Sequence, residues 1–329
     1  MDLIECIPNI SEGQNLIFLD NLSNIISTSK GVELKNRDIG KSVNRTVFTF
    51  IGKEDDIIET VYKLYEACFH NIDMSNHRGT HPRMGAIDVC PFVILGDNNA
   101  TVLHIKIKNL AKKIADEFSI PIYLYEKSAL NSYRKYLASI RKGEYEGWFE
   151  KIKQPEWEPD FGPNKFHKSF GGSVMGHRDL LIAININIEG GSLEIANLIA
   201  KELRETGYWK NINGEKVHFK GLHKGVRAIG WYIPEFKKMQ VSINITDIKS
   251  SPLHQVFQSC IHLALKYNTY IEGSELIGLI PESALINTGI FLNSNKERPS
   301  VQLLDLAIKW LGLSCVKPFD PNIHILRGV

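Results

Sequence analysis

The stretch His77–Leu95, HRGTHPRMGAIDVCPFVIL, joins two kinds of sequence that predict different structures. Its first part, through Gly85, holds two histidines and two arginines together with glycines and a proline. Glycine and proline disfavour regular helix and strand, so this part predicts a constrained polar loop. From Ile87 onward the chain is apolar, which predicts a strand that enters a core. A polar loop carried by a buried strand is a common place for catalysis.

Length and composition limit the class of protein. The chain has 329 residues, a formal net charge of +2 and 43% hydrophobic residues. This length predicts two domains, which we place at 1–179 and 180–329. Because the charges nearly balance, nothing in the bulk electrostatics favours nucleic acid or an acidic membrane. We therefore expect small-molecule substrates, with neither a nucleic acid nor a membrane as partner.

The cysteines and short motifs exclude several other classes. The five cysteines form no CxxC pair and are odd in number, so we expect no disulfide framework and no cysteine zinc site. The first residues lack the basic and apolar regions of a signal peptide, and no segment has the roughly 20 apolar residues of a membrane span. Neither GxGxxG after the first strand nor GxxxxGK[ST] is present, so no dinucleotide or P-loop site is predicted. We expect a soluble, cytoplasmic protein.

Hydrophobic periodicity predicts a mixed, α+β (α/β-type) fold. Residues 54–70 repeat apolar side chains at helical spacing, whereas the isoleucines of 181–188 alternate with smaller or polar residues as in a half-buried strand. Residues 142–179 are rich in Gly, Pro, Trp, Phe and Lys without a sustained period, and predict a long irregular segment. The predicted strands are 4–9, 31–38, 46–51, 87–95, 121–125, 181–188, 226–233 and 239–245, and the predicted helices are 14–29, 54–70, 102–118, 129–141, 192–206, 252–267, 281–291 and 300–311.

The two histidines of the opening loop are the first candidates for chemistry. His77 and His81 are four residues apart, which on a helix could present two zinc ligands. Gly79 and Pro82 argue against a helix, so we expect no metal. An imidazole with an ordinary pKa of about 6.5 can accept and return a proton at neutral pH. The residues alone leave either histidine as a catalytic acid/base or as a structural side chain.

Other polar residues have a structural and a functional interpretation. Asp38, at the end of a predicted strand, is either a turn residue or an active-site carboxylate. Arg45 is either a surface side chain or a clamp for a carboxylate. The segment 161–172 is either an ordinary loop or a wall for a flat ring. The amides of Asn185, Asn187 and Asn244 either face water or line a polar cavity that satisfies a heterocycle.

Seven segments, in order across almost the whole chain, resemble the formiminotransferase family. Together they are specific, although each alone is weak. They are Glu5–Gly13, Asn44–Phe50, Asp73–Phe92, Pro121–Tyr125, Asp160–Pro163, Ala183–Asn187 and Gly230–Tyr232.

The resemblance implies an activity and an architecture. The family moves a formimino group from N-formimino-L-glutamate to N5 of tetrahydrofolate, a co-substrate, in histidine degradation and one-carbon metabolism. It implies two subdomains, each a sheet with helices on its outer face, with the sheets facing across a substrate tunnel, and a homodimer. It implies that His81 is the catalytic acid/base, which leaves His77 a positioning or structural role. It also implies a folate-binding loop formed by Gly162, Pro163, Asn164, Lys165, Phe166, His167, Lys168, Ser169, Phe170 and Gly171.

The chemistry of this reaction suits the candidates. A single imidazole can take the proton from N5 and give one to the departing glutamate nitrogen. A carboxylate such as Asp38 could stabilise the cationic formimino group. The substrates carry several carboxylates, for which Arg45, Arg83, Lys165 and Lys168 are candidate partners, and Asn185, Asn187 and Asn244 are further candidates for substrate binding.

The chain departs from the family at 164–170 and at 207–226, which puts its preference for the folate tail in question. We expect no cyclodeaminase half. Two rival functions remain: a glutamate formyltransferase that uses 5-formyl-tetrahydrofolate, and a folate-binding relative without turnover. The retention of His81 beside Asp38 and Arg45 disfavours the second.

Overall fold

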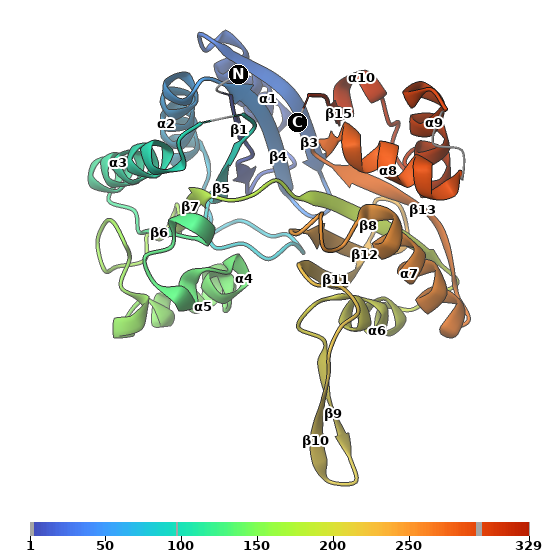
Figure 1. Cartoon of the computed structure of the whole chain (residues 1–329). Coiled ribbons are helices and arrows are strands. Elements are labelled where there is room, and N and C mark those ends of the chain that lie inside the picture. Colours follow the sequence, from blue (N-terminus) through green and yellow to red (C-terminus); the bar gives the residue numbers. More distant parts are fainter. Residues whose placement is uncertain (1–2, 97, 294–297, 329) are drawn as a thin grey trace. The chain divides into compact units, whose positions relative to one another are not determined.

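A computed structural model describes residues 3–96, 98–293 and 298–328 of the chain. It divides into two compact units, Met1–Asp179 and Leu180–Val329 (Figure 1). Both units contain helices and strands that are interspersed along the chain, so the predicted α+β class is confirmed. Among the residues described, no helix is both long enough and apolar enough to span a membrane.

The N-terminal unit is built on a seven-stranded sheet. The predicted strand 4–9 is two short strands, β1 and β2, broken around Pro8, and both pair with β4 on one side and β5 on the other. β3 pairs antiparallel with β4, while β7 runs parallel to both β5 and β6. The strands are β1 (Ile4–Cys6), β2 (Asn9–Ile10), β3 (Val32–Gly40), β4 (Arg45–Gly52), β5 (Ile87–Ile94), β6 (Ile122–Leu124) and β7 (Ser173–His177).

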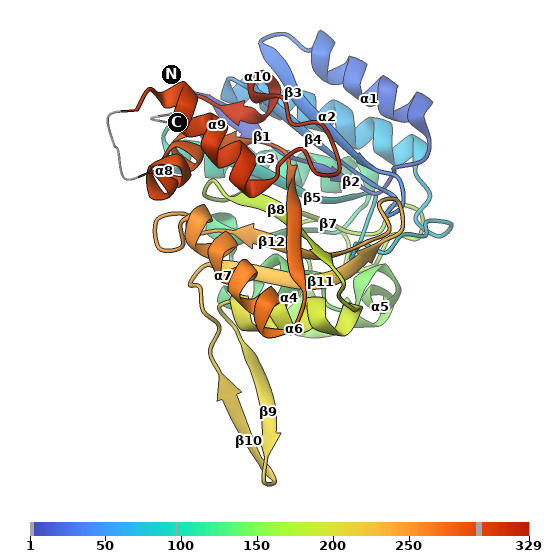
Figure 2. The ribbon, with the colours of Figure 1, turned by 90° about the vertical axis from the view of Figure 1, so that its right-hand side faces the viewer.

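Three long amphipathic helices cover one face of this sheet (Figure 2). They are α1 (Leu16–Thr28), α2 (Glu54–Asn71) and α3 (Ala100–Phe118). Side-chain oxygens of Asn15 and Asn99 cap α1 and α3, and three acidic residues occupy the first turn of α2, where the helix dipole favours negative charge. Their apolar faces pack on the sheet in one continuous core.

Strand alternation gives the sheet a second face with different chemistry. Ile4 and Cys6 on β1, with Phe48 and Phe50 on β4, point into the core beneath the helices. The intervening side chains, including Glu5 and Thr49, point the other way. We call this side the polar face and define it by Glu5, Asn36, Asp38, Arg45, Val47, Thr49 and Ile51, which the strand registers place together.

The segment 126–179 contradicts two predictions. The predicted helix 129–141 is a 3₁₀ turn, Ser132–Arg134, followed by the short helix α4 (Leu137–Arg141), and another 3₁₀ turn, Glu126–Ser128, precedes it. The predicted irregular segment contains α5 (Glu144–Lys151), a 3₁₀ turn and the interior strand β7. Burial of aromatic rings such as Trp148 orders this segment, which has no hydrophobic period to reveal it.

The C-terminal unit contains a four-stranded antiparallel sheet in the order β11-β12-β8-β13. Its isoleucine-rich side packs against helices α6 and α7, and further helices follow along the chain. Strand β13, which pairs with β8, was not predicted. The elements are β8 (Ile182–Glu189), α6 (Leu193–Leu203), β11 (Val226–Ile233), β12 (Lys238–Ile245), α7 (Leu253–Lys266), β13 (Tyr270–Ile277), β14 (Ile280–Pro281), α8 (Glu282–Leu292), α9 (Ser300–Leu311), α10 (Pro321–His324) and β15 (Ile325–Leu326).

The segment 207–226, which the sequence marks as an insertion, folds as a hairpin. β9 (Tyr208–Ile212) and β10 (Glu215–Phe219) pair only with each other in the described structure and project from the unit (Figure 1). Asn213 and Gly214 turn the chain with positive φ, as a two-residue hairpin loop requires.

Candidate active site

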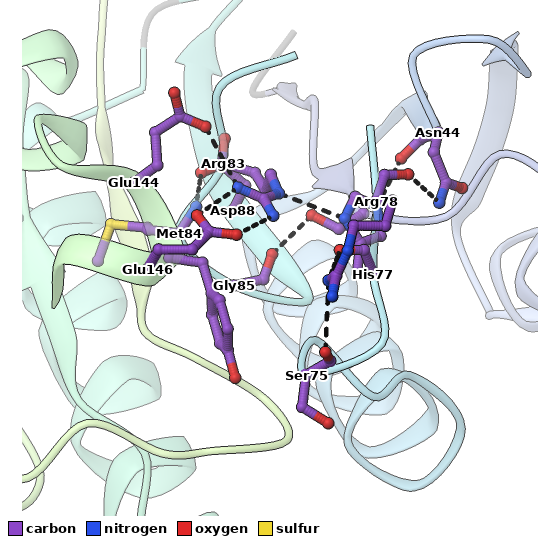
Figure 3. Close-up of polar contacts among 12 residues, drawn as sticks. Asn44, Ser75, His77, Arg78, Arg83, Met84, Gly85, Asp88, Glu144 and Glu146 are labelled. Carbon is purple, nitrogen blue, oxygen red and sulfur yellow. Dashed lines mark hydrogen bonds and ion pairs between the residues drawn. The ribbon is translucent and has the colours of Figure 1, made fainter. Parts of the chain in front are cut away.

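Asn44 fastens the histidine loop to two other segments of the N-terminal unit (Figure 3). Its Oδ1 accepts a hydrogen bond from the backbone of Gly13 at 2.9 Å, and its Nδ2 donates to the carbonyl of Arg78 at 2.8 Å. Its own carbonyl accepts from Nε2 of His77 at 2.9 Å. Asn44 has φ +52°, a left-handed conformation that asparagine tolerates better than most residues. A single side chain therefore holds together segments 30 and more residues apart.

The resemblance left His77 a positioning or structural role, and its contacts agree with a structural one. Nε2 must carry the proton that it donates to Asn44, so Nδ1 is the acceptor for Nε of Arg83 at 3.3 Å. Burial is the main reason that the pKa of His77 lies below its usual value. Both ring nitrogens are thus used within the protein.

His81 has a different environment. Its Nδ1 lies 2.7 Å from the carbonyl oxygen of Pro82, which can only accept, so Nδ1 carries a proton. Burial, followed by the positive charges of Arg45 and Arg141, holds the pKa of His81 well below its usual value. The ring is therefore neutral at neutral pH, with its lone pair on Nε2. This is the protonation state that a general base requires.

Arg45 and Arg141 form a cationic cluster beside His81. Arg45, at the start of β4, donates to Oδ1 of Asn9, and burial lowers its pKa to about 10. Arg141, at the end of α4, forms an ion pair with Asp88 on β5. The Nε groups of both arginines are buried and have no hydrogen-bond partner in the part of the chain that the structure describes. Buried unsatisfied donors are costly, so these groups are well suited to bind an acceptor such as a carboxylate.

Asp38 lies near this cluster on the polar face. It is half-buried on β3, where it pairs with Val47. Burial lowers the pKa of Arg45, and the negative charge of Asp38 acts in the opposite direction. Asp38 and His81 thus both lie close enough to Arg45 for the charges to interact. Asp88 is a second carboxylate there, and its Oδ1 accepts from the backbone of Met84, which ties the cluster to the histidine loop.

Arg83 is already engaged by glutamates (Figure 3). Its guanidinium, 6% exposed, binds both carboxylate oxygens of Glu146 at 2.7 and 2.9 Å and contacts Glu144 at 3.2 Å. These contacts raise the pKa of Arg83, and the hydrogen bond from Arg83 lowers that of Glu146. Arg83 therefore attaches the histidine loop to α5, and its expected contact with substrate stays a prediction.

The segment 162–171 is hydrogen-bonded to the end of the histidine loop. The carbonyl of Phe170 accepts from Ala86 at 2.7 Å, and the amide of Gly172 donates to Met84 at 3.1 Å. The two chains approach so closely that a Cβ on Gly171, which has φ +79°, would lie 2.2 Å from the carbonyl oxygen of Met84. Glycine is required there by both conformation and space.

The rest of this segment lines a hollow of 1320 Å³ together with side chains of the same unit such as Asp73, Phe149 and Lys153. Gly162, Pro163, Asn164, Lys165 and Lys168 are exposed, and His167 and Ser169 are half-buried. Phe166 is buried, stacks on Trp148 and also lines the hollow, whereas Phe170 is buried in the core, where it stacks on Tyr65. Their rings thus help to shape the loop from within, and His81 is not one of the residues that line the hollow.

The candidate asparagines of the C-terminal unit belong to a polar row across its sheet. Asn185 and Asn187 on β8 are buried, whereas Asn244 on β12 is exposed. Gln240 donates to Asn187 at 2.8 Å, and Asn185 donates to Glu275 at 3.2 Å. Within the described ranges, no three His, Cys, Asp or Glu side chains are close enough to hold a metal ion.

Several of these residues were not predicted. Arg141, Asp88, Gln240 and Glu275 were not singled out from the sequence, and Asn44 was quoted only as part of a motif. The sequence offered one signal for these residues. Asp88 is a charged residue inside an apolar strand, and because a buried charge requires a partner, it indicates an ion pair. The partner itself, Arg141, lies 53 residues away.

A neutral imidazole beside two arginines is an arrangement suited to proton transfer next to an anion. Comparison with known proteins agrees. Residues 3–178 match the formiminotransferase domain, N-terminal subdomain, and residues 183–328 match the formiminotransferase domain. The chain therefore belongs to the formiminotransferase family.

Curated relatives include proteins of two sizes. The glutamate formimidoyltransferase of Streptococcus pyogenes serotype M1 is 38% identical over 285 residues, which is 87% of this chain and 91% of the relative. The formimidoyltransferase-cyclodeaminases of Dictyostelium discoideum and Mus musculus are each 40% identical, over 98% and 99% of this chain. The chain spans 59% of the length of these two relatives.

Proposed function

We propose that this chain is a glutamate formimidoyltransferase that moves the formimino group from N-formimino-L-glutamate to N5 of tetrahydrofolate. The observation that carries the proposal is the neutral imidazole of His81 beside two arginines whose buried Nε groups have no hydrogen-bond partner among the described residues. The relative of similar length supports the donor, because its name is that of a glutamate formimidoyltransferase.

The proposed reaction proceeds by addition and elimination. N5 of tetrahydrofolate attacks the formimino carbon, and Nε2 of His81 takes the proton that N5 loses. The bond between the carbon and the glutamate nitrogen then breaks, and the same imidazole returns the proton to that nitrogen. The products are 5-formimino-tetrahydrofolate and L-glutamate, so no proton is gained or lost overall.

The neighbouring charges have separate roles in this scheme. Asp38 stabilises the formimino group in its cationic, more electrophilic form. Arg45 and Arg141 bind a carboxylate of the donor through their Nε groups, and burial, together with these positive charges, keeps His81 neutral. Arg83 holds the histidine loop on α5, and its predicted contact with a substrate carboxylate is part of the proposal.

We propose that segment 162–171 and the hollow behind it receive the folate, whose glutamate tail the exposed Lys165 and Lys168 attract. The polar row of Asn185 and Asn187, with Asn244 at its exposed end, contributes further substrate contacts. We also propose a cytoplasmic homodimer. Light scattering tests the assembly, because a mass near that of one 37.3 kDa chain would contradict a dimer.

The experiment that tests the function uses purified chain and tetrahydrofolate with either N-formimino-L-glutamate or N-formyl-L-glutamate. We expect 5-formimino-tetrahydrofolate and glutamate in equal amounts from the first donor and no transfer from the second. Transfer from the formyl donor alone would contradict the proposed donor. Folate binding without any product would contradict an enzymatic function.

A further inference from the structure

Two buried polar side chains on the polar face have no role in the reaction described above. Glu5 on β1 is 3% exposed, and Thr49 on β4 is fully buried. β1 and β4 are adjacent, and Glu5 pairs with Ile51, which places it diagonally beside Thr49 on the same side of the sheet. Thr49 in turn pairs with Asn36 on β3, and Asp38, two residues further along β3, points to the same face.

One oxygen of each side chain lacks a hydrogen-bond partner. Oε2 of Glu5 and Oγ1 of Thr49 are buried and make no hydrogen bond among the described residues. Leaving a buried polar atom unsatisfied is costly, and such atoms in native proteins call for an explanation. Here two of them lie side by side on a face that also carries Asp38 and Arg45. A ligand that donates hydrogen bonds would satisfy both.

The charges around Glu5 agree with this explanation. No described ion pair involves Glu5, and Arg178, which follows β7, only partly offsets the effect of burial, so the pKa of Glu5 is raised to about 7. A buried carboxyl without a paired cation is a poor site for another carboxylate. It is a good site for N–H groups, which supply the hydrogen bonds that the ionised form needs.

We propose that Glu5 and Thr49 form a substrate-binding subsite for a ligand edge that carries adjacent N–H donors. This inference rests on the proposed function. Two parts of the substrates have this chemistry: the cationic formimino group, and the amino and ring N–H of the 2-amino-4-oxo-pyrimidine ring of tetrahydrofolate. A carboxylate can accept from two such donors at once.

The position of the subsite favours the ring. Thr49 is four residues along β4 from Arg45, or about 13 Å at the usual rise of a strand, and Glu5 lies opposite a point still further along. The formimino group must reach Nε2 of His81, beside Arg45, at the other end of this row. The formimino carbon is bonded to N5 and stays at His81, whereas the pyrimidine N–H groups lie on the far side of the ring system from N5. Of the two candidate groups, the ring edge is therefore the one that can approach the side chains that project from Thr49 and Glu5.

The test measures binding of each substrate alone to Glu5→Gln, Thr49→Val and a matched control, Glu33→Gln, by calorimetry. Glu33 makes the control because it is exposed on the same sheet. We expect Glu5→Gln to weaken binding of tetrahydrofolate at least tenfold and Thr49→Val several-fold, while the affinity for N-formimino-L-glutamate stays within twofold. In turnover, Glu5→Gln should raise KM for tetrahydrofolate and change kcat less than threefold.

Unchanged affinity for tetrahydrofolate in Glu5→Gln would overturn the inference, as would a loss confined to N-formimino-L-glutamate. An equal loss in Glu33→Gln would also overturn it. These results are distinguishable from failure of the proposed function, which is seen in the wild-type chain as absence of transfer. Far-UV circular dichroism of each variant verifies that it is folded, and Thr49→Val tests the subsite without changing any charge.

Discussion

Replacing Glu5 by glutamine should stabilise the protein at alkaline pH. Burial raises the pKa of this carboxyl from 4.5 to about 7, so the folded chain holds a proton between these values that the unfolded chain has released. The stability of the wild type therefore falls as pH rises through this window. At 1.36 kcal/mol per pKa unit, the full cost is about 3 kcal/mol above pH 7. Glutamine has the same shape and cannot ionise, so it removes this cost.

The assay is urea unfolding of wild type, Glu5→Gln and the exposed control Glu33→Gln at pH 5 and pH 8. We expect Glu5→Gln to be more stable than wild type by about 3 kcal/mol at pH 8 and by less than about 1 kcal/mol at pH 5. Glu33→Gln should match the wild type at both. An equal difference at the two pH values, or a destabilised Glu5→Gln at pH 8, would refute the reasoning. A gain in stability with weaker folate binding is typical of functional sites.

Three further predictions concern the histidine loop. Because the pKa of His81 is lowered, kcat/KM for N-formimino-L-glutamate, measured at saturating tetrahydrofolate so that the Glu5 subsite is filled, should be level above pH 6.5 and fall only below it, as the imidazole gains a proton. A midpoint at or above 6.5 would contradict this. Asn44→Ala removes two hydrogen bonds and leaves the amide of Gly13 unsatisfied, so the free energy of unfolding should fall by about 2–4 kcal/mol. A change below about 0.5 kcal/mol would show that Asn44 does not hold the loops. Gly171→Ala places a Cβ against the carbonyl of Met84, so the free energy of unfolding should fall by about 2 kcal/mol or more, and the affinity for folate should also fall. An unchanged melting temperature would contradict the close approach.

The sequence predicted those elements whose signals are local. Helices α1, α2 and α3 follow hydrophobic periods, and the alternation in β8 and β12 shows which side of that sheet is polar. Strand β7 was missed because Ser173–His177 is short and contains glycine and histidine, and it is ordered by parallel pairing with strands far away in sequence. The hairpin β9–β10 was missed because its strands carry polar residues on both sides.

The site was predictable only in part for the same reason. The glycines and proline of the histidine loop indicate a constrained turn, and the resemblance distinguished His81 from His77. The clamp formed by Asn44 joins three segments, and the pair of Arg141 with Asp88 joins α4 to β5. No sequence period encodes such contacts. Segment 161–172 was interpreted either as an ordinary loop or as a wall for a flat ring, and the wall stays a prediction; Phe166 is buried in the core and lines the hollow, whereas Phe170 is buried in the core.

The central claim is that the neutral imidazole of His81 carries the proton between the two nitrogens. The most direct test is the rate of 5-formimino-tetrahydrofolate formation by His81→Ala, with and without added imidazole. We predict that kcat falls by about 10²–10⁴-fold, that both substrates still bind, and that free imidazole restores part of the rate. A His81→Ala chain that turns over at close to the wild-type rate would contradict the claim.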